Sequence, residues 1–462
     1  MRRTTTRRTL IAAASAAALL DAATDTLANE STPDAGSPDS ILPDTPAGQQ
    51  LAWVVSIING ERELPDSTGI EANFAPSFLD ILPASDLIAT FQQLQAALAP
   101  LEVTEIVGLE TPLMLNVVTS TRDGSQIVVS ISVEDGDDHL IDGLLFAPYD
   151  QQEIEFPTFG SWEEVSDALA SDSGSFGISV SHLNGEDLEP VNQVQEDVAF
   201  AIGSLFKLYV LAAVITTIEA GDLAWSDEIE VVEEYLSYPS GVTQSEPLGT
   251  MISVQVLASR MISISDNTAT DLLLHHIGRD AVEQALGTLG NSVPELNRPF
   301  LSTREMFLLK LGDEDTRNAF VAANEADRRA QLDELSRASL PPISDVVAWT
   351  SPVAIDTIEW FATMRDIEHA LLWLRDAWAR PGLEPVKDIM MANLGVPFDR
   401  DIWSQVAFKG GSEPGVLALA WLLERSDGEV FTFALAVNDT TTPLDQEAIT
   451  LTAGGAVALL ET

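Results

Sequence analysis

The sequence contains no cysteine, and lysine stands at only four of its 462 positions, Lys207, Lys310, Lys387 and Lys409. The lack of cysteine excludes disulfide bonds, thiolate metal sites, a cysteine nucleophile and a lipid attached through cysteine. Basic residues number 23 against 72 acidic ones, which gives a formal net charge of -49. Phosphate binding requires clusters of basic side chains, so we expect no nucleic-acid partner.

Long apolar runs are also lacking. The run from Leu10 to Leu20 is shorter than the roughly 20 residues that span a bilayer, so we expect no permanent membrane anchor. It follows the pair Arg7-Arg8 and precedes a small-x-Ala end at Ala28, which is typical of a twin-arginine export signal over residues 1–28. The alternative is the basic start of a cytosolic domain. Because dense carboxylates keep a protein soluble in concentrated salt, we expect an extracellular or cell-envelope protein of a saline environment.

The length and the 45% hydrophobic content predict two folded domains after a leader. Residues 29–48 are rich in Pro, Ser, Asp and Gly, which predicts a disordered acidic linker. Residues 51–98 have helical spacing, with a break at Pro83, and runs after residue 112 alternate as strands. We therefore expect a small α+β domain over residues 49–150. Its acid-rich stretch Glu134–Asp138 lacks the spacing of a calcium loop and predicts a solvated turn.

A second domain is predicted over residues 176–462, after a linker at 151–175. Strands are expected around Asn184-Gly185 and again at 415–438, with a mainly helical region between them and a last helix from about Asp445 to Leu460. Strands from both ends of one domain imply a single antiparallel sheet with helices and a helical lobe beside it.

Ser204 and Lys207 stand at the head of an apolar helix that we expect to continue from Leu205 to Ala220. Ser204 alone could be a helix N-cap, and Lys207 could extend its charge to solvent. Residues three apart share a helix face, however, so the amine lies beside the hydroxyl. Apolar neighbours lower the pKa of a lysine, and a neutral amine can take the proton of a serine.

Two further motifs follow along the chain. Ser265-Asp266-Asn267 separates two apolar helical runs, and Lys409-Gly410-Gly411 leads into a strand. Taken alone, the first could be a helix N-cap and the second a turn. Together and in this order, Ser-x-x-Lys, Ser-Asp-Asn and Lys-Gly-Gly resemble the three active-site motifs of the serine penicillin-recognising enzymes, class A β-lactamases in particular.

The resemblance covers roughly residues 176–462 and implies a β-lactamase/transpeptidase-like fold. It implies that Ser204 is the acylated nucleophile, Lys207 its base and Ser265 the proton shuttle to the leaving nitrogen. Asn267 would bind the substrate amide, and Lys409 would supply positive charge. The N–H groups of Ser204 and Ser412, beside Gly411, would form the oxyanion hole.

Two positions depart from the pattern of these enzymes. The middle residue of the third motif is usually Thr or Ser and here is Gly410, which removes a hydroxyl that would hold a substrate carboxylate. The glutamate that precedes Pro-x-Leu-Asn in class A enzymes, the base for the deacylating water, is replaced by Val293. Glu295 in the same loop is the candidate replacement base.

The small domain, with helices before a meander, resembles the nuclear-transport-factor or steroid-isomerase type of fold. Joined to a β-lactamase-like domain, it resembles a family of exported actinobacterial proteins that includes one from clavulanic acid biosynthesis gene clusters. No cofactor or metal is expected, because His275-His276 lack a third ligand and are interpreted as partners of the helix dipole or as packing residues. Trp360 and Trp373 are interpreted as core residues. The sequence leaves the oligomeric state open.

The expected function is that of a serine hydrolase acting on β-lactams or related amides and esters. A D-alanyl-D-alanine peptidase or esterase of the same fold is the alternative enzyme. A slow binder or sensor of penicillin or peptidoglycan is the alternative from another class.

Overall fold

The computed structural model describes residues 42–43, 45–79, 82–107, 113–122, 124–134, 136, 138–149, 156–172, 174–185, 187–238, 240–342, 346 and 348–461. The predicted export signal and most of the predicted acidic linker lie outside these residues. Asp135 and Asp137 of the acid-rich turn also lie outside them. The chain divides into two compact units, Met1–Glu153 and Ile154–Thr462.

The first unit packs helices against one face of a four-stranded antiparallel sheet of order β1-β2-β3-β4. Strand β3 alternates buried and half-buried residues, and its buried side faces the helices, as a period of two requires. Trp53, Phe74 and Phe91 meet at ring-centroid distances of 6.1–6.4 Å inside this core. The elements are α2 (Pro46–Ile58), α3 (Ser67–Glu71), α4 (Pro76–Leu79), α5 (Ala84–Leu98), β1 (Glu102–Ile106), β2 (Met114–Ser120), β3 (Gln126–Val133) and β4 (Ile141–Pro148).

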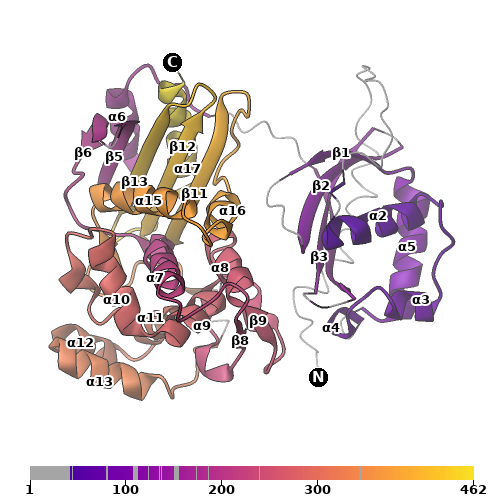
Figure 1. Ribbon diagram of the computed structural model, residues 1–462, viewed down its shortest axis with the longest axis horizontal. Coiled ribbons are helices and arrows are strands. Elements are labelled where there is room, and N and C mark those ends of the chain that lie inside the picture. The colour runs from indigo at the N-terminus through magenta and orange to yellow at the C-terminus, as the bar shows by residue number, and fades with distance from the viewer. Residues whose placement is uncertain are drawn as a thin grey trace. The chain divides into compact units, whose positions relative to one another are not determined.

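The second unit contains a five-stranded antiparallel sheet of order β11-β12-β13-β5-β6, so strands from both ends of the domain lie side by side (Figure 1). Its strands are β5 (Ser175–Asn184), β6 (Asp187–Val194), β11 (Trp403–Glu413), β12 (Val416–Arg425) and β13 (Val430–Asn438). Short pairs join β7 (Phe200–Ala201) with β10 (Phe361–Ala362) and β8 (Glu228–Glu230) with β9 (Met251–Ser253). The predicted α+β class is confirmed.

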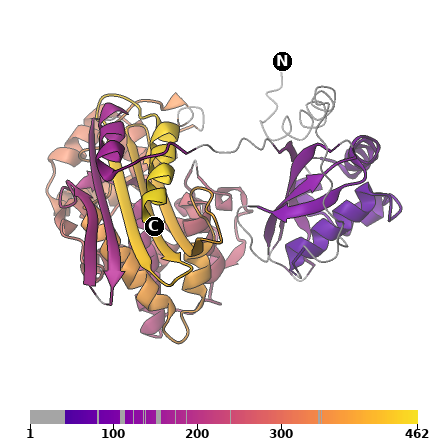
Figure 2. The same ribbon diagram turned by 90° about the horizontal axis from the view of Figure 1, so that it is seen from above.

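Helices cover both faces of this sheet. They are α6 (Trp162–Asp172), α7 (Lys207–Glu219), α8 (Val254–Ser263), α9 (Asn267–Ile277), α10 (Arg279–Thr288), α11 (Thr303–Leu311), α12 (Glu314–Ala322), α13 (Glu325–Leu335), α15 (Met364–Trp378), α16 (Pro385–Met391) and α17 (Gln446–Val457). The 3₁₀ turns are η2 (Gly203–Phe206), η3 (Glu233–Tyr235), η4 (Thr243–Ser245), η5 (Pro294–Asn297) and η6 (Ala458–Leu460). Figure 2 shows α17 and α6 together on one face of the sheet.

The two faces of the sheet carry different side chains. Toward α17 and α6 the strands present large residues such as Trp403, Trp421 and Phe433. Toward the helical lobe they present small ones such as Ala418, Ala420 and Ala434, which belong to the core of the lobe. Small side chains let the lobe helices approach the sheet closely.

Helix α7 lies in the centre of the lobe. Its residues from Lys207 to Ile215 are all buried, as expected of a helix that is apolar on every side. The position of α7 matters for function because its first residue is a lysine. Burying the head of this helix removes that lysine from water.

Two differences from the sequence-based expectation concern element bounds. Helix α6 occupies much of the segment 151–175 that was predicted to be a linker, and it packs on α17, so the second domain begins before residue 176. Lys409-Gly410-Gly411 lies inside β11 and does not precede a strand, because the Gly residues at 410 and 411 pair with Leu419 and Ala418 of β12. Glycine lowers strand propensity, which hid this strand in the sequence.

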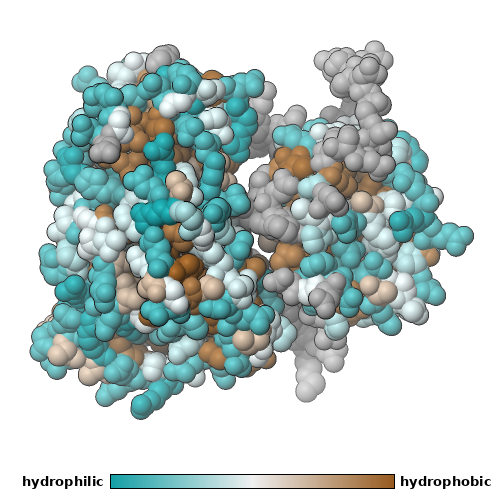
Figure 3. Space-filling model, viewed as in Figure 1, coloured by the Kyte–Doolittle hydropathy of each residue, from teal (hydrophilic) through white to brown (hydrophobic). Residues whose placement is uncertain are grey.

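The surface of the second unit seen in Figure 3 is mostly hydrophilic, with separate apolar patches. None of the helices in the described ranges combines the length and the apolar character that a membrane span requires.

Candidate active site

Ser204 lies in the 3₁₀ turn η2, directly before α7, and is half-buried. The sequence predicted an α-helix from Leu205, whereas the helix begins at Lys207. Side chains three residues apart eclipse in a 3₁₀ turn, so this local geometry stacks Ser204 and Lys207 on one side. The motif is therefore formed by the turn and the first helical residue together.

Lys207 is completely buried and donates three hydrogen bonds. The acceptors of its Nζ are Ser265 O at 2.6 Å, Ser265 Oγ at 3.0 Å and Asn267 Oδ1 at 2.8 Å. Burial lowers the pKa of Lys207 to about 7, against the opposing charges of Asp266 and Asp271. An amine of this pKa is partly neutral near neutral pH and can accept a proton.

The three residues of the Ser-Asp-Asn motif make different contacts. Ser265 has a φ of 56°, a left-handed conformation that ends α8 and turns the serine toward the lysines. Asp266 caps α9 by accepting the N–H of Ala269 at 2.8 Å. Its other carboxylate oxygen accepts the N–H of Val242 at 2.7 Å, which holds the neighbouring loop. The helix-cap interpretation therefore applies to Asp266, while Ser265 and Asn267 reach Lys207.

Lys409 approaches the same serine from β11. Its Nζ donates to Ser265 Oγ at 3.0 Å and to Gly410 O at 2.6 Å. Burial and the positive charge of Lys207 lower the pKa of Lys409 well below its usual range. One hydroxyl thus lies between two amines from distant parts of the chain.

Gly411 brings the β11 backbone into contact with η2. A Cβ atom at Gly411 would lie 2.4 Å from Ser204 N and 2.3 Å from Ile202 O, which no side chain allows. Gly203, with a φ of 47°, also lies close to the β11 backbone. A Cβ atom at Gly203 would be 3.0 Å from Ser412 N. The two N–H groups predicted for an oxyanion hole, of Ser204 and Ser412, therefore belong to adjoining backbone segments.

The loop of residues 292–299 carries one carboxylate, that of Glu295. Val293 packs beside Ala201 and Phe361 in a small apolar cluster, and the Glu295 side chain is exposed. Among the described residues, Glu295 forms no hydrogen bond with Ser204, Lys207 or Ser265. The amide of Asn297 is used by the main chain, with Nδ2 donating to Phe361 O at 2.9 Å and Oδ1 accepting Phe361 N at 2.8 Å.

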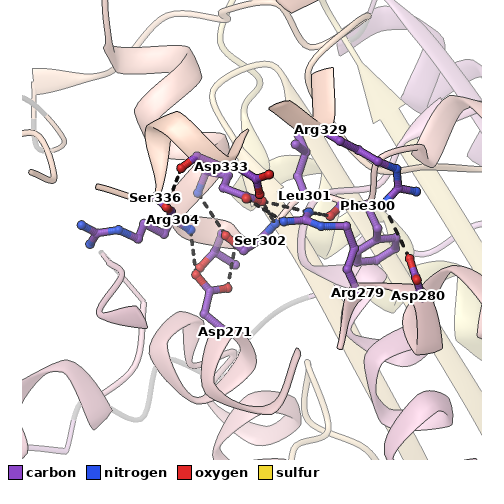
Figure 4. A network of polar contacts seen from close by, with 12 residues as sticks. Asp271, Arg279, Asp280, Phe300, Leu301, Ser302, Arg304, Arg329, Asp333 and Ser336 are labelled. Carbon is purple, nitrogen blue, oxygen red and sulfur yellow. Dashed lines mark hydrogen bonds and ion pairs between the residues drawn. The ribbon is translucent and has the colours of Figure 1, made fainter. Parts of the chain in front are cut away.

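Polar contacts fix the chain that leaves this loop (Figure 4). Asp271 of α9 accepts the N–H of Arg304 at 2.8 Å, and Arg279 of α10 donates to Phe300 O. Burial raises the pKa of Asp271 to about 7. These contacts, which nothing in the local sequence indicated, hold the start of α11 against the helix that carries Asn267.

Trp360, Trp373 and His275, which the sequence singled out, occupy packing positions, whereas His276 is exposed. Trp360 is buried and stacks on Phe206 at a centroid distance of 3.7 Å. His275 stacks on Tyr235 at 4.1 Å. Trp373 is partly buried in the same core. The described residues include no group of three or more His, Asp or Glu side chains arranged to hold a metal ion.

Comparisons with known proteins agree with this geometry. Residues 161–332 match the model of the family described as "Beta-lactamase enzyme family", and residues 41–138 match "ORF 12 gene product N-terminal". β-Lactamase VEB-1 of Pseudomonas aeruginosa is 26% identical over 126 residues, which are 27% of this chain and 41% of that protein. A β-lactamase of Rhodobacter capsulatus is 31% identical over 105 residues, 22% of this chain and 36% of its own.

A solved structure, the β-lactamase of Sphaerobacter thermophilus, is 20% identical, and the match covers 64% of this chain and 96% of that one with a TM-score of 0.45. The chain spans well under half the length of the two curated relatives. The second domain has a β-lactamase-like fold, and the match to the β-lactamase family model lies within it. The particular reaction of this chain is a matter for proposal.

Proposed function

We propose that the second domain acylates Ser204 with β-lactams or related amides and esters, and that the acyl-enzyme is then hydrolysed slowly. The observation that carries this proposal is the buried Lys207, which stands three residues after Ser204, donates to Ser265 and Asn267, and has a pKa lowered to about 7. A lysine in this state is a base, and the alternative role of a solvent-exposed charge does not fit complete burial.

In the proposed first step, Ser204 Oγ bonds to the substrate carbonyl carbon and its proton passes to neutral Lys207. The carbonyl oxygen becomes negative and accepts hydrogen bonds from the N–H groups of Ser204 and Ser412. The bond to the leaving nitrogen or oxygen then breaks. Ser265 gives its proton to the leaving atom and takes one from Lys207. Lys409 stabilises the Ser265 oxygen by donating a hydrogen bond to it.

The second step requires a water molecule and a base. The side chain of Val293 can neither accept a proton nor form a hydrogen bond, and Glu295 is exposed. We therefore propose that deacylation limits turnover, since a positioned base contributes typically 10²–10⁴-fold. This favours a slow hydrolase, and it keeps a penicillin or peptidoglycan binder as the second candidate function.

Intact-mass measurement after incubation with penicillins, cephalosporins and simple esters tests the proposal. We expect the mass of one acyl group to be added to the natural chain and none to Ser204→Ala. An adduct on Ser204→Ala would contradict the nucleophile. Release of D-alanine from a D-alanyl-D-alanine peptide would identify the peptidase, and an adduct that persists for hours without product would identify the binder.

We also propose that the chain is exported by the twin-arginine pathway, from the Arg7-Arg8 pair and the apolar run that follows it. Replacing both arginines by lysine should retain the protein inside the cell. Unchanged secretion of that variant would contradict the proposal.

A further inference from the structure

A buried ion cluster outside the three motifs joins three distant segments of the second domain. Lys310 of α11 donates to Glu359 Oε1 at 2.9 Å and also pairs with Glu413, the last residue of β11. The relative exposures are 2% for Lys310, 3% for Glu359 and 8% for Glu413. Three ionisable side chains at this depth require a physical explanation, because removing charges from water is costly.

The charges of the cluster balance if one glutamate keeps its proton. Burial and the negative charge of Glu359 raise the pKa of Glu413 well above its usual range, although Lys310 opposes the shift. Glu413 Oε2 has no hydrogen-bond donor in the described part of the chain. One ammonium, one carboxylate and one carboxylic acid then carry no net charge together. Such a cluster can remain buried without a further partner.

Each glutamate is attached to one side of the predicted oxyanion hole. Glu413 directly follows Ser412 in β11. Glu359 directly precedes Trp360, whose carbonyl accepts the N–H of Ile202 at 3.0 Å, two residues before Ser204. The next residue, Phe361, pairs with Ala201 in the β7–β10 ladder. Lys310 therefore links the backbone that presents one N–H group to the backbone that presents the other.

We propose that Lys310, Glu359 and Glu413 are positioning residues that hold the N–H groups of Ser204 and Ser412 at the separation required by the developing oxyanion. The inference rests on the proposed acylation of Ser204. An ion cluster suits this task because its hydrogen bonds are directional, whereas apolar packing lets segments slide. Its loss slows the covalent step and leaves the initial binding of substrate nearly unchanged, because the donors act on a charge that appears only in the transition state.

The test compares labelling by a fluorophosphonate probe, which needs no particular substrate and places an oxygen between the two N–H groups. In Lys310→Met we expect kinact to fall about tenfold, with KI changed less than about twofold, a part of the 10²–10³-fold loss known for removal of a whole donor. Glu413→Gln, which has the shape of the neutral acid, should lose less kinact than Lys310→Met. Lys387→Met, on α16, is the matched control and should label like the natural protein.

Lys310→Met leaves two buried carboxyl groups without a cation and can fail to fold. The variant Lys310→Met/Glu359→Gln/Glu413→Gln buries no unpaired charge, and such replacements are tolerated elsewhere. It should fold and show the same loss of kinact. Labelling of this folded triple variant at the natural rate would overturn the inference.

Hydrogen exchange followed by mass spectrometry separates this inference from the proposed function. Peptides covering residues 199–208 and 409–416 should exchange faster in the triple variant than in Lys387→Met. If the natural protein takes no probe, the proposed function fails, and the exchange measurement still decides the positioning role. Unchanged exchange in both peptides would refute it.

Discussion

The rate of Ser204 acylation should follow the titration of Lys207. The pKa of this lysine falls from 10.5 to about 7 because the side chain is buried, and the carboxylates of Asp266 and Asp271 oppose that fall. The shift corresponds to about 5 kcal/mol in favour of the neutral amine. Lys207 accepts the Ser204 proton only when it is neutral. The acylation rate is therefore low in acid and increases with pH.

The size of the rise in labelling rate between pH 6 and pH 8 distinguishes this buried lysine from a lysine with an ordinary pKa. With a pKa of about 7, about a tenth of Lys207 is neutral at pH 6 and about nine-tenths at pH 8. The labelling rate should therefore rise about tenfold over this interval and then level off. A lysine with an unshifted pKa would give about a hundredfold rise and no plateau.

Stopped-time labelling with a fluorescent penicillin or fluorophosphonate between pH 5.5 and 9 measures this profile. Lys207→Arg, which stays charged at every pH in this range, should lose the rate, while Lys387→Arg keeps both rate and profile. Asp271→Asn should move the midpoint to lower pH, since it removes a charge that raises the pKa of Lys207. A rate that still climbs tenfold between pH 8 and 9 would show that the pKa of Lys207 is not lowered to about 7.

Three further predictions concern the departures from the motifs and the surface. Val293→Glu should speed hydrolysis of the acyl-enzyme at least tenfold in burst kinetics, with Val293→Gln as the control for size; equal slow phases in both would exclude a base at this position. Gly410→Ser should lower KM for carboxylated penicillins relative to Gly410→Ala, although a Cβ there would lie 3.0 Å from Phe408 Cζ and requires the ring to shift. Tm should rise between 0.1 and 3 M potassium chloride, because the net charge of -49 repels itself less when screened; a flat profile would contradict a saline habitat.

The sequence predicted the parts of the site that depend on short-range order. Ser204 and Lys207 are one helical turn apart, and any helix or 3₁₀ turn brings them together. Ser265 and Lys409 are distant in sequence from Ser204 and Lys207. Their place in the site was predicted from the order of the three motifs and their resemblance to known enzymes. The sheet was predicted because Asn184-Gly185 is a strong hairpin signal and because the residues of 415–438 form apolar runs.

Other parts of the site could not be predicted, for a physical reason. Glu359, Glu413 and Lys310 have no common periodicity and stand far apart in a chain dense with carboxylates, so nothing distinguishes them from surface charges. Asn297 presents the same problem, because its partner, Phe361, contributes main-chain atoms and no recognisable side chain. Burial of a polar group becomes visible only when tertiary structure removes water from it.

The arrangement of the two active-site lysines bears on which substrates the proposed hydrolase accepts. Ser265 Oγ is 3.0 Å from the Nζ of each lysine, so two positive charges in this buried place would repel each other strongly. The first proton favours Lys207, which has the nearby Asp266 and Asp271, and the positive charge of Lys207 then lowers the pKa of Lys409.

The lowered pKa of Lys409 weakens its attraction for a substrate carboxylate, and its Nζ already donates to Ser265 Oγ and Gly410 O. The hydroxyl usual at position 410 is replaced by hydrogen, with the Phe408 ring beside it. Across the ladder, Lys409 and Gly410 face Ala420 and Leu419, which add no charge. Each of these features weakens the binding of a carboxylate, so within the proposed range of amides and esters they favour substrates that carry none.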